Sequence, residues 1–251
     1  MSNFGVQPYD EAKTMISAHT MLEAAEANLG VVPDQLRRVL EVTDGEWSER
    51  WETLQQCELS GPIRSFLFKL NHRRLPLFSV AWLQQHYGRS HCILCQREEK
   101  ETYSHLFSEC EVAEQLWQAA SPMIALLQIS PTADMRPMRL VGDLSHAKLG
   151  NLGNHWPNDQ PRPTQDKLWR WTRVLWTEMR AAVLHPIWMA RCALLAGDEI
   201  TTREEAAQRA SQQSTMLLRS LVYRKVPSLL EGALRPKSSS LLTFIGRRGV
   251  G

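Results

Sequence analysis

Apolar side chains recur at helical spacing along much of the chain. Between residues 63 and 71, four apolar residues follow the i, i+3, i+4, i+7 pattern of an amphipathic helix. The same periodicity predicts further helices over residues 77–87, after Cys110, and from Asp166 to Trp188. Thr202 and Glu205 have the spacing of a capping box, which predicts the start of one more helix. The pattern therefore predicts a mainly α protein with at most one short hairpin.

Cysteine usage is the first chemical signal. The 251 residues include five cysteines, and the N-terminus has no basic start followed by an apolar stretch. We therefore expect no secretory signal, and an odd number of cysteines then argues against a disulfide framework. Both observations favour a reducing, intracellular compartment, either nucleus or cytoplasm. No run approaches the roughly 18 apolar residues of a membrane span, so no membrane association is expected.

Three of the cysteines lie beside a histidine at metal-ligand spacing. Cys92, Cys95, His105 and Cys110 form the pattern C-x2-C-x9-H-x4-C. Three thiolates and one imidazole fill the four positions of tetrahedral zinc, whereas a catalytic zinc keeps one position for water. We therefore predict one structural zinc. The alternative is a group of free thiols with a chance histidine, and His91 is a poorer ligand than His105 because it adjoins Cys92.

Charge is strongly segregated although the net charge is only +2. Residues 1–60 carry 11 acidic and 4 basic side chains, whereas residues 61–92 carry no acidic side chain. The basic residues of that second stretch are Arg64, Lys69, Arg73, Arg74 and Arg89. They are candidates for contacts with nucleic-acid phosphate, and Trp82 is a candidate for stacking on a base. The alternative is that the acidic and basic segments pack against each other.

The residues around the cysteines resemble a known family. From Cys92 to Trp117 the chain shows a CxxC, an acidic spacer with Glu-Thr, then His-Leu-Phe, a cysteine and Leu-Trp. This order resembles the zinc-binding domain that follows the polymerase in LINE-type (non-LTR) retrotransposon reverse transcriptases. The turn Arg74-Leu75-Pro76 and the later Ile187-Trp188-Met-Ala-Arg191 are similar to flanking motifs of that family. The resemblance implies a nucleic-acid-associated accessory domain with zinc at the same four residues.

Signatures of catalysis are missing from the sequence. It contains no Asp-Asp dipeptide and no G-x-x-x-x-G-K phosphate loop, and carboxylates are sparse between residues 115 and 200. We therefore expect a non-enzymatic zinc protein that binds RNA or DNA, as an accessory domain of a retrotransposon reverse transcriptase or a remnant of one. The alternative is a zinc-stapled protein–protein interaction module. A zinc hydrolase or deaminase is disfavoured because the predicted coordination sphere is filled.

The expected fold is mainly α, with helices around a small CCHC zinc knuckle followed by a second helical segment. Residues 128–165 are rich in proline, glycine, asparagine and aspartate, which is typical of an irregular connector. The predicted segments are an acidic helical N-terminal segment (1–60), a reverse-transcriptase-type zinc-binding domain (61–127), the connector (128–165), a helical C-terminal segment (166–230) and a flexible basic tail (231–251).

Overall fold

The structure is a computed structural model that describes residues 44–125, 127, 135–142, 144, 164–196 and 202–230. The chain divides into two compact units, Met1–Glu49 and Arg50–Gly251. The described helices belong to the second unit, except that residues 44–49, at the start of the first described helix, belong to the first unit. Most of the acidic N-terminal segment, much of the connector and the basic tail lie outside the described residues.

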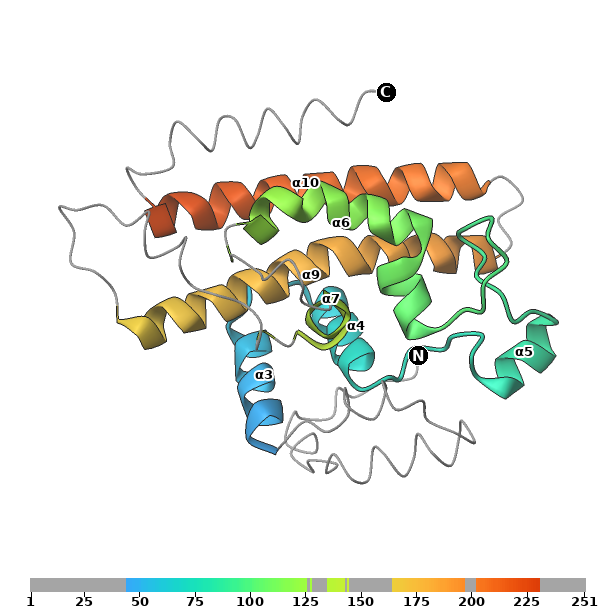
Figure 1. Ribbon diagram of the computed structural model, residues 1–251, viewed down its shortest axis with the longest axis horizontal. Coiled ribbons are helices and arrows are strands. Elements are labelled where there is room, and N and C mark those ends of the chain that lie inside the picture. Colours follow the sequence, from blue (N-terminus) through green and yellow to red (C-terminus); the bar gives the residue numbers. More distant parts are fainter. Residues whose placement is uncertain are drawn as a thin grey trace, which may run out of the picture. The chain divides into compact units, whose positions relative to one another are not determined.

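Every regular element in the described part of the chain is a helix, which confirms the mainly α prediction. The elements are α3 (Asp44–Gln56), α4 (Gly61–Asn71), α5 (Ala81–Tyr87), the π-helical turn η2 (His105–Glu109), α6 (Glu111–Ala125), α7 (Met135–Val141), α9 (Gln165–Leu195) and α10 (Arg203–Leu230) (Figure 1). One isolated antiparallel bridge joins His91 to Lys100 and closes a short hairpin. None of the described helices combines the length and the apolar character that crossing a membrane requires.

Helix α4 follows from its apolar stripe and from the chain at its end. Phe66, Leu67 and Leu70 are buried, as the periodicity predicts. The helix ends in a Schellman arrangement, in which the amides of Arg73 and Arg74 donate to the carbonyls of Leu70 and Lys69 at 3.0 and 2.8 Å. Arg73 takes the left-handed position with φ 52°, where glycine is usual. The turn after α4 is therefore sharp and carries an arginine in an uncommon backbone conformation.

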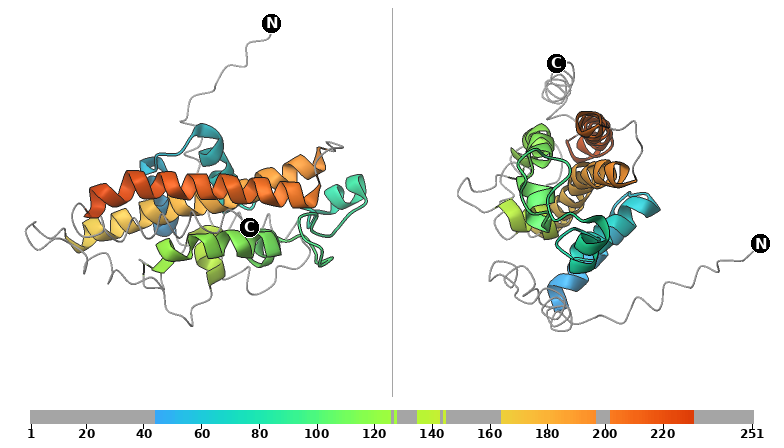
Figure 2. Two further views of the ribbon diagram at one scale, coloured as in Figure 1. Left: turned by 90° about the horizontal axis from the view of Figure 1, so that it is seen from above. Right: turned by 90° about the vertical axis from the view of Figure 1, so that its right-hand side faces the viewer.

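Helices α9 and α10 run antiparallel and side by side, and α6 packs along both (Figure 2). Apolar positions of α9 such as Trp176, Met179 and Val183 are buried, whereas Trp169, Val174 and Trp188 are half-buried. Trp176 stacks on Trp117 of α6 with ring centroids 5.9 Å apart. At the start of α10, the Glu205 amide donates to Thr202 and the Thr202 amide donates to Glu205. These contacts confirm the predicted helices and the capping box.

One short helix falls where the sequence predicts an irregular connector. Helix α7 lies inside residues 128–165 and buries Met138, Leu140 and Val141. Its backbone is fixed by α9, because the indole of Trp176 donates to the Met138 carbonyl at 3.0 Å. The proline-rich composition of this stretch did not predict helix α7. Tertiary contacts stabilise the helix more than its intrinsic helix propensity does. The irregular-connector prediction is therefore wrong for these seven residues.

A buried ion pair joins α9 to the loop that precedes η2. The guanidinium of Arg191 donates to both carboxylate oxygens of Glu101 at 2.7 and 3.0 Å. Both side chains are almost fully buried, at 1% and 0% exposure. The Arg191 guanidinium also lies 5.0 Å from the ring centroids of Phe78 and Trp188, so it is enclosed by aromatic faces. The pair therefore joins the end of α9 to the loop and is shielded from bulk solvent.

Breaking this pair from one side should destabilise the fold strongly. Replacing Arg191 with methionine leaves the Glu101 carboxylate buried without its cation, and we expect a loss of about 3–5 kcal/mol in the free energy of unfolding. The double variant Glu101→Gln/Arg191→Met should lose less, because no buried charge is left unpaired. Urea unfolding at neutral pH measures the free energy of unfolding of both variants.

The matched control is Arg224→Met, which removes a partly exposed arginine 3.1 Å from exposed Glu58. Solvent screens that pair, so its loss should change the urea midpoint little. Equal effects of Arg191→Met and Arg224→Met would contradict the importance assigned to the buried pair.

Candidate metal centre

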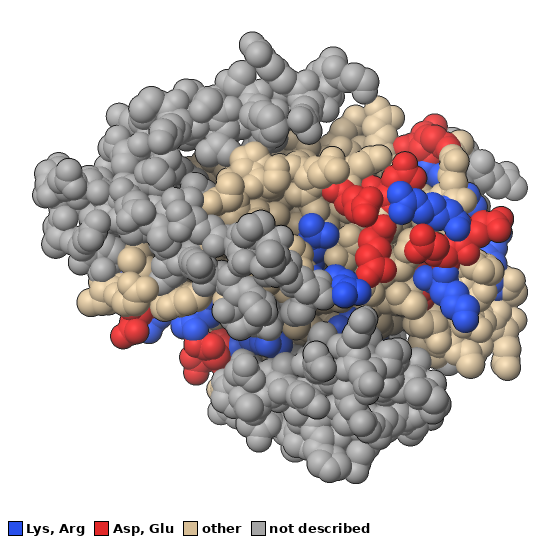
Figure 3. Space-filling view, viewed as in Figure 1, with Lys and Arg blue, Asp and Glu red and all other residues tan. Residues whose placement is uncertain are grey.

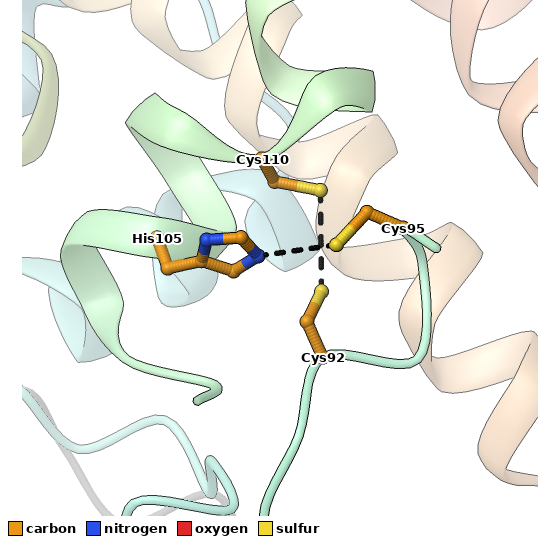
Figure 4. Close-up of side chains that lie close together, drawn as sticks. All are labelled: Cys92, Cys95, His105 and Cys110. Carbon is orange, nitrogen blue, oxygen red and sulfur yellow. Dashed lines mark hydrogen bonds between the residues drawn. The ribbon is translucent and has the colours of Figure 1, made fainter. Parts of the chain in front are cut away.

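The four predicted ligands meet at one buried point. Cys92, Cys95, His105 and Cys110 are each buried, and their ligand atoms all lie within 4.8 Å of one another (Figure 4). The sulfurs of Cys92 and Cys110 are 3.9 Å apart, and the Cys95 sulfur is 3.4 Å from Nε2 of His105. Zinc–sulfur bonds of about 2.3 Å at tetrahedral angles place two sulfurs about 3.8 Å apart. The separations fit zinc, and they are too long for a disulfide.

The first ligand pair is placed by the hairpin. The Cys92 amide donates to the Glu99 carbonyl at 2.8 Å, and the Glu101 amide donates to the Ser90 carbonyl at 3.0 Å. Between these bonds the chain turns back, with Glu98 in the left-handed region at φ 50°. The CxxC pair therefore sits on a short loop whose ends are fixed to each other by backbone hydrogen bonds.

The second ligand pair depends on the π-helical turn. His105 is the first residue of η2, and Cys110 follows its last residue. The Cys110 amide donates to the His105 carbonyl five residues back at 2.6 Å. An α-helix rotates residues five apart by about 140° from each other, and the wider π turn brings them nearer to one side. This turn is what allows an H-x4-C spacing to supply two ligands to one ion.

A carboxylate supports the histidine from outside the ligand set. Oε2 of Glu99 lies 2.9 Å from Nδ1 of His105, on the ring atom opposite the one that faces the sulfurs. The approach lacks hydrogen-bond geometry and is an electrostatic contact. A carboxylate beside Nδ1 favours the proton on that atom, which leaves Nε2 to bind a metal. The Cys92 sulfur and, more weakly, the Glu99 carboxylate raise the pKa of His105 against the opposing effect of burial. Glu99 was not predicted from the sequence, where its only signal is its position six residues before the histidine.

Two thiols of the cluster have raised pKa values. A hydrogen bond with Cys110, together with burial, raises the pKa of Cys92 to about 12, and burial raises the pKa of Cys95. Zinc binds thiolates, so it must displace these protons, and its affinity must fall as the pH falls. With four protein ligands and no position for water, the centre supplies structural stabilisation.

Other candidate ligands are excluded by position. His91 is exposed, and its Nδ1 lies 3.3 Å from the hydroxyl of Ser90. Cys57 is buried elsewhere and donates to the Thr53 carbonyl at 3.1 Å. His105 is therefore the histidine of the cluster, as the spacing predicts.

The predicted nucleic-acid-binding residues are in different environments. Lys69, Arg74 and Arg89 are exposed. Arg64 is half-buried and donates to the carbonyls of Cys57 and Leu59, and the Arg73 guanidinium lies 4.9 Å from the centre of the Tyr103 ring. The side chain of Trp82 lies outside the described residues. Figure 3 shows acidic and basic side chains interleaved on the visible face of the described part.

Comparison with known proteins agrees with this geometry. Residues 40–117 match a family model described as zinc-binding in reverse transcriptase. The matched segment contains all four ligands, the hairpin and η2, and it ends within α6. This part of the chain is therefore similar to the zinc-binding domain of reverse transcriptases, and the three-cysteine, one-histidine cluster supports one zinc ion. No curated protein and no solved structure matches the chain.

The contact between Glu99 and His105 predicts a graded effect on zinc affinity. Replacing Glu99 with glutamine removes the charge beside Nδ1 and should weaken zinc binding about tenfold while the four ligands remain. Competition with a chromophoric chelator measures the affinity. The control is Glu98→Gln, the adjacent exposed carboxylate. Equal affinities for the two variants would show that Glu99 does not support the ligand.

Proposed function

We propose that this chain is a non-catalytic accessory domain of a LINE-type retrotransposon reverse transcriptase, or is derived from one, and that it binds RNA or DNA. The observation that carries the proposal is the buried, fully protein-ligated metal centre within the segment that matches the reverse-transcriptase zinc-binding family. The zinc has a structural role in this proposal. Its function is to hold the surrounding backbone in the conformation that meets nucleic acid.

The hydrogen bonds around the centre support this role. The loop between the ligand pairs carries Glu101, which accepts the Phe78 amide at 2.8 Å. Close by, the Tyr103 hydroxyl accepts the Leu75 amide at 2.7 Å and donates to the Leu75 carbonyl at 2.9 Å. Both side chains hold the connection between α4 and α5, which contains Arg74. The zinc loop is therefore bonded directly to the basic segment.

Three exposed cations supply the proposed contacts. Lys69 and Arg74 lie together at the end of α4, where the Arg74 amide meets the Lys69 carbonyl, and Arg89 follows α5. The stretch from residue 61 to residue 92 contains no carboxylate that would compete with phosphate. Arg64 and Arg73 have a structural part in this account, because their guanidinium groups face backbone carbonyls and an aromatic ring.

Charge reversal tests the proposal. The triple variant Lys69→Glu/Arg74→Glu/Arg89→Glu should bind mixed-sequence RNA and single-stranded DNA far more weakly than the wild type. If all three contact phosphate, the slope of log affinity against log salt should fall by about 2. Fluorescence anisotropy of labelled oligonucleotides over a salt series measures both quantities.

The matched control reverses Arg170, Arg203 and Arg209, which are exposed residues of α9 and α10. It has the same net charge as the test variant and should keep most of the affinity. Equal losses in the two triple variants would place the contacts elsewhere. No binding by zinc-loaded wild type at low salt would reject the proposal.

The second candidate is a zinc-stapled protein–protein interaction module. It is favoured by Met216 and Tyr223, which lie seven residues apart on α10 and are 70% and 64% exposed. Residues seven apart share one helix face, so these side chains present apolar surface together. If the zinc-loaded, folded chain does not bind nucleic acid, this second function is favoured.

A further inference from the structure

A pocket lined by cations lies away from the metal centre. It opens to solvent between the later part of α3, the end of α4, the end of α7 and the middle of α9. Three arginines line it, and its described lining includes no carboxylate. Its lining includes Arg50, Asn71, Gly142, Arg173, Thr177 and Arg180.

Arg180 forms the floor of this pocket. The side chain is 2% exposed, and each of its hydrogen bonds goes to a neutral oxygen. Nε donates to the Arg139 carbonyl at 2.9 Å, and Nη2 donates to the Leu140 carbonyl at 2.7 Å and to Oδ1 of Asn71 at 3.1 Å. No carboxylate in the described part of the chain pairs with this guanidinium. Within the described residues, its charge is therefore fixed in place by neutral groups and has no carboxylate counterion.

The backbone opposite Arg180 is shaped to admit the guanidinium. Gly142 has φ +75°, and a Cβ at this position would lie 2.8 Å from Nη1 of Arg180. Any other residue would press on that nitrogen and would also be strained at this φ. Glycine therefore leaves Nη1 in place beside the pocket, and none of the hydrogen bonds described above uses this donor.

Neighbouring cations increase the local positive charge. Burial, together with Arg50 and Arg73, lowers the pKa of Arg180 to about 9. A guanidinium keeps its proton at neutral pH, so the cluster stays charged. A buried charge without a counterion is costly, and an anion in the pocket would offset this cost.

We propose that this pocket, the Arg180 pocket, binds the oxyanion of a phosphate group. Arginine forks match phosphate oxygens, and the Thr177 hydroxyl and the other pocket arginines add donors around them. A tetrahedral anion can use more of these donors than a planar carboxylate can. The phosphate belongs either to a small free ligand or to a nucleic-acid backbone.

This site is distinct from the basic surface at Lys69, Arg74 and Arg89 and does not depend on the function proposed for it. Inorganic phosphate alone probes the pocket, so the site can be confirmed even if the chain binds no nucleic acid.

The test is thermal unfolding of the zinc-loaded full chain in sodium phosphate, sodium acetate and sodium chloride at equal ionic strength and neutral pH. Phosphate at ten times its dissociation constant should raise the unfolding midpoint by about 3–6 °C. Phosphate also stabilises proteins through general exclusion from their surface, so a variant must separate the two effects. Thr177→Asp places a carboxylate inside the pocket and should abolish the specific, saturable response.

Ser211→Asp is the matched control, because it adds the same charge at an exposed position of α10. It should respond to phosphate as the wild type does. If Thr177→Asp does not fold, Arg173→Gln replaces it, since Arg173 is only half-buried, and should raise the phosphate dissociation constant about tenfold. The same phosphate response in the pocket variant and the wild type, or an equal saturable response to acetate, would overturn the proposal.

An oligonucleotide arm separates the two sources of phosphate. Weaker oligonucleotide binding by the pocket variant than by Ser211→Asp assigns the pocket to a nucleic-acid backbone. Unchanged oligonucleotide binding together with a lost phosphate response assigns it to a small free ligand.

Discussion

Four ligands from two separate pieces of chain must reach one ion, and most of the local structure follows from that requirement. Cys92 and Cys95 arrive on a hairpin loop, while His105 and Cys110 bracket a π-helical turn. Both pieces are short, and each also buries apolar side chains, such as Ile93 and Phe107. Zinc coordination can add to this packing, because binding energy at such a site is folding energy.

The loop between the two ligand pairs connects the metal centre to helix α9 through hydrogen bonds and packing. Glu101, at the end of the hairpin, accepts hydrogen bonds from both Arg191 of α9 and the Phe78 amide. Ile93 of the CxxC loop packs with Phe78 and Leu83, and Leu194 and Leu195 of α9 lie against this cluster. The family match ends at residue 117, yet Arg191, Leu194 and Leu195 contact the zinc loop and its neighbours from beyond it. The zinc loop and the long helices therefore act as one packed structure within the second unit.

The sequence predicted the elements whose signals are local. The apolar stripe of α4, the capping box of α10 and the ligand spacing each involve residues close together in the chain, and each is confirmed. The π turn, the Glu99 contact and helix α7 could not be predicted in this way. The π turn depends on the geometry of the ion, and the Glu99 contact depends on the orientation of the His105 ring. Helix α7 depends on Trp176, which lies 38 residues from Met138. Charge runs showed which residues are basic but could not separate exposed Lys69 from Arg73, whose guanidinium is covered by Tyr103.

The central claim is that one zinc ion holds this structure together, and zinc content per chain tests it most directly. The purified wild type should contain one zinc, Cys92→Ser/Cys110→Ser should contain none, and Cys192→Ser, outside the cluster, should retain one. Helicity followed by circular dichroism should fall when a chelator removes the metal from the wild type. A well-folded wild type without zinc, or helicity and stability unchanged by chelation, would contradict the account.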